Sequence, residues 1–147
     1  MFIIAHLAAG LIIGNLTGNY SFAILGALFL DLDHLYVYAK HKVLFNPKKF
    51  WKAVTSPEDP YGCQRNYVHS IFPWIAVTLV VILIESPAGY AFSLGYLSHL
   101  ILDMIDGSDF YPLYPFTRYN FKGPIKYLSN SEIGLTFLLF AVFLITL

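Results

Sequence analysis

Ionisable side chains interrupt stretches of sequence that otherwise read as membrane helices, and this pattern limits the possible folds more than any other feature. An aspartate at the centre of a membrane helix costs about 2.5–3.5 kcal/mol on insertion scales. Groups this costly are expected to have a shared use. They occur at His6 and in three runs, Asp31-Leu32-Asp33-His34, His69-Ser70 and His99-Leu100-Ile101-Leu102-Asp103.

The composition is that of a small integral membrane protein. Of the 147 residues, 57% are hydrophobic and only 12% are charged, whereas soluble domains carry about 25% charged residues. We therefore predict an all-α membrane bundle, with one domain over residues 1–147. The net charge of zero gives no support for direct nucleic-acid binding. The single cysteine, Cys63, excludes an internal disulfide and a cysteine-rich zinc site.

The apolar blocks predict about five short transmembrane helices. A turn is expected at 86–89, and polar segments are expected at 40–66 and 107–130. Pro47 to Val54 is expected to form a short interfacial helix, with Phe50 and Trp51 at the lipid boundary. The five helices are predicted at residues 2–16, 21–39, 67–85, 90–106 and 131–147.

All nine lysines and arginines lie in the two polar segments. One round trip across the membrane separates these segments, so both are expected on one side, which the positive-inside rule makes cytoplasmic. This predicts a multi-pass protein of the inner (plasma) membrane with a cytoplasmic N-terminus. The ionisable residues then all lie at one depth, near the cytoplasmic face.

Helical spacing groups these residues further. His99, Asp103 and Asp106 share one helix face, as do Asp31 and His34. Asp33 points away from Asp31 in an ideal helix, so it takes part only if the helix is distorted there or if it serves a second ion. Six residues are predicted as metal ligands: His6, Asp31, His34, His69, His99 and Asp103.

Mixed imidazole and carboxylate ligands suit zinc, with manganese or iron as alternatives, better than calcium or magnesium. Six ligands are enough for one or two ions. Structural interpretations remain open for single members. His6 can also be explained by a hydrogen bond inside a helix, Asp33 by a solvated interfacial position, and His69 by a helix cap. Asp106 can be explained by a loop position, and His99 by structural pairing with Asp103.

These residues lie within recognisable motifs. The chain resembles the YdjM-like family of inner-membrane proteins, which are described from prediction as membrane-bound metal-dependent hydrolases, with a LexA-binding label on some members. The resemblance covers His6 to about Phe116. The matching motifs are His6 with Gly10, residues 26–34, Arg65 with His69-Ser70, residues 95–103, and residues 112–116.

The resemblance implies metal ligation by His6, Asp31, Asp33 or His34, His69, His99 and Asp103. It also shows departures from the family pattern. Leu30 replaces a proline that often precedes the first aspartate, and Gln64 and Asn66 stand in a stretch that often reads His-Arg-Gly.

The leading functional hypothesis is hydrolysis of an ester or phosphoester in a lipid-like or phosphorylated substrate at the cytoplasmic face. Asp33 or Asp106 would act as general base or orient an imidazole, and Arg65, with Lys122 or Arg118, would neutralise a phosphate. Two alternatives stay open: a divalent-metal transporter or sensor, and a membrane adaptor with a structural metal site. Homo-oligomerisation also stays open.

Overall fold

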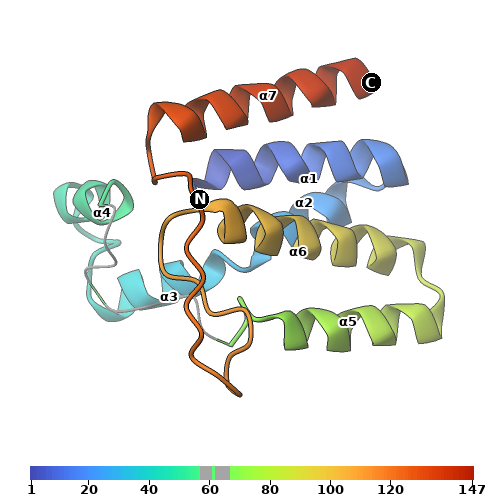
Figure 1. Ribbon diagram of the computed structural model, residues 1–147, viewed down its shortest axis with the longest axis horizontal. Helices are drawn as coiled ribbons and strands as arrows, with labels where there is room; N and C mark the ends of the chain where they lie inside the picture. Colours follow the sequence, from blue (N-terminus) through green and yellow to red (C-terminus); the bar gives the residue numbers. More distant parts are fainter. Residues whose placement is uncertain (57–60, 62–66) are drawn as a thin grey trace.

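The computed structural model describes residues 1–56, 61 and 67–147, which form seven α-helices and no strands (Figure 1). This confirms the all-α prediction and the short helix predicted at Pro47–Val54, whereas one of the five predicted transmembrane helices is divided into two. The helices are α1 (Ile3–Thr17), α2 (Tyr20–Phe29), α3 (Leu32–Lys40), α4 (Pro47–Val54), α5 (Ile71–Ile84), α6 (Pro87–Ile105) and α7 (Asn130–Thr146).

Polar side chains cap the starts of α2, α4, α6 and α7. Gly18 ends α1 with a φ of 69°, a left-handed conformation that glycine adopts readily, and the Asn19 side chain caps α2 by accepting from the Phe22 N–H. Ser129 caps α7 by accepting from the Glu132 N–H. The turn predicted at 86–89 is wrong, because Ser86 caps α6 and Pro87 takes its first position, where a missing N–H is harmless.

The predicted helix 21–39 is also wrong as a single element. It breaks between Phe29 and Leu32, and its two halves are bent by 46°. At the break the N–H of Asp31 donates to the Leu28 carbonyl at 3.2 Å, and that of Asp33 donates to the Leu30 carbonyl at 3.3 Å. These three-residue hydrogen bonds tighten the backbone and change the direction in which the side chains after Leu30 point.

Small residues bring α2 and α6 into close contact. A Cβ on Gly26 would meet the backbone of Phe92, and a Cβ on Gly95 would meet the Ala23 carbonyl, both well inside van der Waals distance. Only glycine permits this approach, which is typical of helix pairs in membranes. The contact sets α2, and therefore Asp31, against the face of α6 that carries His99.

Figure 1 shows α1, α5, α6 and α7 running side by side, with α4 seen along its axis. The N-terminus, α3, α4 and the 107–129 segment gather at one end of the bundle, and the C-terminus lies at the other. The described parts of both basic segments therefore lie at the same end as the N-terminus. Their cytoplasmic location stays a prediction.

Within the described residues, none of the helices by itself combines the length and apolar character needed to cross a membrane. The bent pair α2 and α3 meets both requirements when taken together, by length and composition.

Candidate metal centre

The six residues predicted as metal ligands lie together. They form three overlapping groups in which the candidate ligand atoms lie within 4.8 Å of one another, and which could hold a metal ion. The contributing segments are α1, the α2–α3 break, α3, the residues before α5, and α6. The groups are His6, Asp31 and His99; Asp31, His34 and His69; and His69, His99 and Asp103.

The break between α2 and α3 decides where the aspartates point. Asp31 Oδ1 lies 3.9 Å from His99 Nε2 and 4.0 Å from His34 Nε2. Asp33 Oδ2 lies 3.2 Å from His69 Nδ1. A straight helix would turn Asp33 away from Asp31, so the distortion on which its participation depended is present. Asp33 contacts a candidate ligand without belonging to any of the three groups.

His99 is held by the backbone of the neighbouring helix. Its Nδ1 lies 2.7 Å from the carbonyl oxygen of Ala27 in α2. A carbonyl accepts only, so Nδ1 carries the hydrogen, and Nε2 is the nitrogen left for a metal ion. Nε2 faces Asp103 Oδ2 at 3.3 Å. A ligand histidine in a metal site usually has this arrangement, with one ring nitrogen donating to protein and the other directed at the ion.

Asp103 lies at the centre of the imidazoles. Its carboxylate oxygens lie 3.5 Å from His6 Nε2 and 3.6 Å from His69 Nε2. The rings of His6 and His99 stack at a centroid distance of 3.7 Å.

Burial lowers the pKa of His69, which precedes α5, although Asp33 and Asp103 oppose the shift. The lowered pKa favours the neutral imidazole, which is the form that binds a metal.

Several buried polar atoms of the cluster make no hydrogen bond of ordinary geometry among the described residues, although His69 and Asp33 lie within ion-pair distance of each other. These atoms are both ring nitrogens of His6 and of His69, Nε2 of His99, Oδ2 of Asp31 and both carboxylate oxygens of Asp33. Buried polar groups are satisfied in the great majority of cases. The side chains of His6, His69 and His99 are fully buried. Lone pairs of this kind, concentrated on imidazole and carboxylate, fit a divalent transition-metal ion.

Asp106 has a different environment. It is fully buried at the end of α6, and its Oδ2 lies 2.7 Å from the α-amino group of Met1. The same amino group lies 2.9 Å from Asp103 Oδ1. Asp106 belongs to none of the three groups, so it is linked to the cluster through Met1 and Asp103.

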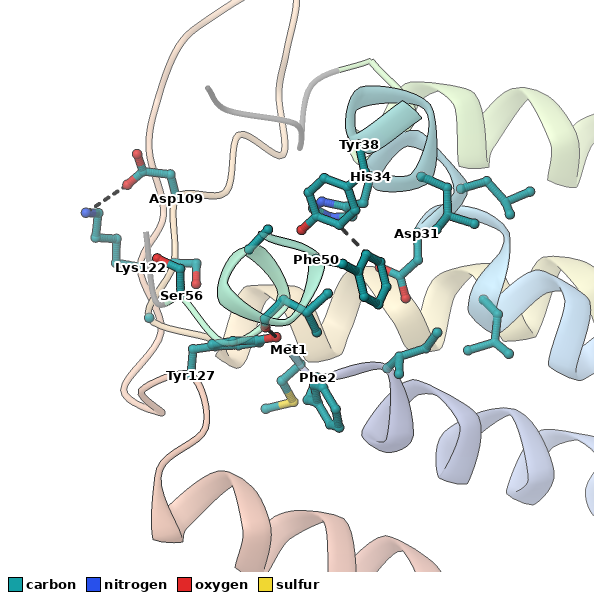
Figure 2. Close-up of a pocket in the computed structure, with 18 residues that line it drawn as sticks. Met1, Phe2, Asp31, His34, Tyr38, Phe50, Ser56, Asp109, Lys122 and Tyr127 are labelled. Carbon is teal, nitrogen blue, oxygen red and sulfur yellow. Dashed lines mark hydrogen bonds and ion pairs between the residues drawn. The ribbon is translucent and has the colours of Figure 1, made fainter. Parts of the chain in front are cut away.

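A cavity of about 720 Å³ adjoins the cluster through Asp31 and His34. Figure 2 shows these two residues on one side of the cavity, and Lys122 and Asp109 on the other. Lys122 Nζ lies 2.8 Å from Asp109 Oδ1, and this carboxylate raises the pKa of Lys122. Arg65, the other predicted phosphate contact, lies outside the described residues, and Arg118 is exposed.

The sequence reasoning missed three structural features. The aromatic wall of the cavity, Tyr38 and Phe50, comes from segments whose aromatics were assigned to the membrane boundary. The Ala27 carbonyl is a backbone group, which no side-chain pattern indicates. Glu132, in the first turn of α7, is buried and accepts from the Phe2 N–H at 2.6 Å and from the Leu128 N–H.

Comparison with protein-family models gives a match to the YdjM inner membrane protein family over residues 1–147. No curated protein and no solved structure matches the chain. The family match spans every segment that contributes to the His/Asp cluster. The chain therefore belongs to the YdjM inner membrane protein family.

Proposed function

We propose that this protein is a membrane-bound metal-dependent hydrolase that cleaves an ester or phosphoester in a lipid-like substrate at the cytoplasmic membrane face. One observation carries the proposal: buried imidazole and carboxylate atoms without hydrogen-bond partners converge from five segments beside a large cavity. A purely structural cluster would satisfy these atoms internally.

Asp31, His34, His69, His99 and Asp103 would hold the metal, with His6 as a further ligand or an orienting partner. We favour zinc, with manganese or iron as alternatives. Asp31, His69 and His99 each belong to two groups, which suits a site for two ions. When bound, the metal would supply a water of lowered pKa and polarise the scissile carbonyl or phosphoryl group.

The protein's own groups would do the rest. Asp33 is 24% exposed and faces His69, so it would orient that imidazole or accept a proton from the attacking water. Asp106, held by the Met1 amino group, would fix Asp103 indirectly. Lys122 would place a positive charge at the far side of the cavity, where a phosphate of the substrate would bind.

The test begins with elemental analysis of the purified protein and of His99→Ala and Asp103→Ala. Parent and variants are then assayed on phospholipids with added zinc or manganese. We expect the parent to contain metal and to hydrolyse a lipid, and both variants to lose metal and activity. His41→Ala is the matched control, because His41 is exposed and outside the cluster.

Two results would defeat the proposal. The first is a parent that hydrolyses no lipid ester or phosphoester under any metal condition. If this inactive parent contains metal, and a chelator lowers its stability, the cluster is a structural metal site. The second is activity that survives in His99→Ala, because the reaction would then lie elsewhere in the chain.

A further inference from the structure

The cavity beside the candidate metal centre has a rim of apolar side chains. Ile3 of α1 and Leu32 and Leu35 of α3 all line it. These side chains are 47%, 50% and 44% exposed, respectively, in the folded chain. These three side chains therefore line the cavity and are also accessible from outside the described chain.

The two sides of the cavity differ in chemistry. Figure 2 shows Lys122, Asp109 and Ser56 on the side away from Asp31, with the rings of Phe50 and Tyr38 between. The rim formed by Ile3, Leu32 and Leu35 carries no charge and no hydrogen-bonding side chain. Water-exposed sites usually place polar groups at their mouth, whereas an uncharged rim on a membrane protein matches hydrocarbon.

We propose that the acyl chain of a membrane lipid passes between α1 and α3, across Ile3, Leu32 and Leu35, and is held in this cavity. The proposal rests on the proposed function, because it places the scissile ester of that lipid at Asp31 and His34. The substrate would reach the site sideways from the bilayer, without leaving it for water.

An acyl chain is the proposed ligand because the apolar rim residues are next to candidate metal ligands in the sequence. Leu32 follows Asp31 directly in the chain, and Leu35 follows His34. The same short segment therefore presents a candidate ligand and an apolar rim residue in adjacent positions, twice. All four residues line the same cavity, so an acyl chain lying on Leu32 and Leu35 would place its carboxyl or glycerol end near the two candidate ligands. The volume of about 720 Å³ falls in the range of pockets that enclose an organic ligand.

The first experiment measures binding and does not depend on turnover. The protein is reconstituted in vesicles of phosphatidylethanolamine and phosphatidylglycerol that contain a phosphatidylglycerol with a diazirine on an acyl-chain carbon close to the ester. After irradiation, peptide mass spectrometry locates the label. We expect labelling of the residues 28–35 segment and of the start of α1, and loss of most of it in Leu32→Trp/Leu35→Trp.

Leu83→Trp is the matched control, because Leu83 is 82% exposed on α5 and does not line the cavity. It should keep the parent's labelling of residues 28–35. The metal content of each variant, measured in parallel, shows whether the site is still assembled. If the double variant loses metal, the milder Leu35→Phe replaces it. Labelling confined to α5 and α7, or unchanged in the rim variants, would overturn the proposal.

The second experiment distinguishes entry of the acyl chain from the bilayer from the hydrolysis step itself. Hydrolysis of a long-chain phospholipid is compared with hydrolysis of a short-chain, water-soluble ester. We expect the rim variants to lose about tenfold or more on the long-chain lipid, while the soluble ester keeps nearly its parent rate. Equal losses on both substrates would overturn the lateral path. A parent that cleaves neither substrate, yet labels at residues 28–35, would reject the proposed function and retain the chain site.

Discussion

The Nδ1 atom of His99 lies 2.7 Å from the carbonyl oxygen of Ala27, so the orientation of a candidate ligand on α6 is set by the backbone of α2. The relationship depends on the close approach of these two helices at Gly26 and Gly95. Helix packing and metal binding are therefore expected to be coupled.

Metal removal should lower stability. An ion that binds only the folded state, present at a thousand times its dissociation constant, stabilises by about 4 kcal/mol. We expect a chelator to lower the thermal unfolding midpoint of the detergent-solubilised parent, and zinc to restore it. Without any addition, His99→Ala should already unfold at the lower midpoint, and neither the chelator nor zinc should change it. A parent midpoint insensitive to chelator, after the loss of metal is verified by elemental analysis, would contradict this prediction.

The α2–α6 contact offers a second test. In Gly95→Ala, the new Cβ would meet the Ala23 carbonyl, so α2 must move away from α6. We expect a loss of about 1–3 kcal/mol in stability and weaker metal retention, because Asp31 moves with α2. The control is Gly134→Ala in α7, where a Cβ meets nothing within 4 Å and stability should be unchanged or slightly higher.

Two sequence patterns predicted most of the candidate ligands. The spacing of His99 and Asp103 places both on one helix face, and the grouping of the basic residues places every candidate ligand at one depth. Both signals are local or global properties of the sequence. They do not require knowledge of which helices touch, so they predicted the set of residues that the structure brings together.

The break before Asp31 left a weaker signal. Neither Leu30 nor Asp31 is a helix breaker, and the apolar pattern continues through them, so one helix was predicted. The proline that family members often carry at the Leu30 position points to a break, because proline disrupts a helix. The cavity left no signal at all, since its walls come from segments distant in the sequence that meet only through the packing of α1, α2 and α6.

Glu132 is expected to stabilise the N-terminal end of the bundle. Its buried carboxylate accepts from the Phe2 and Leu128 backbone N–H groups, and hydrogen bonds to charged groups contribute about 1.5–3 kcal/mol each. Glu132→Gln should lower stability measurably in chemical unfolding. Glu85→Gln, at an exposed position, serves as control. Equal stability of the two variants would show that these hydrogen bonds contribute little.

Lys122 should affect phosphate-containing substrates selectively. Its ammonium group faces Asp109 at 2.8 Å on the side of the cavity away from Asp31. We expect Lys122→Gln to raise KM for a phosphoester several-fold, while KM for an uncharged carboxylic ester stays near the parent value, because only the phosphate carries a charge to be neutralised. A matching rise for both substrates would assign Lys122 a role in shaping the cavity.

Asp33 tests whether the bend between α2 and α3 serves the metal centre. Its carboxylate lies 3.2 Å from His69 Nδ1, on the side of the ring away from Asp103, which faces Nε2. Carboxylates in this position orient a ligand imidazole and increase its basicity, and their loss typically weakens metal binding or activity about 10–100-fold. Asp33→Asn should therefore weaken zinc binding by that factor in competition with a fluorescent chelator, with little change in helix content.

Asp109→Asn, which removes a carboxylate paired to Lys122 instead, should leave zinc affinity unchanged. If Asp33→Asn binds zinc as tightly as the parent but loses turnover, the carboxylate acts on the attacking water and not through His69.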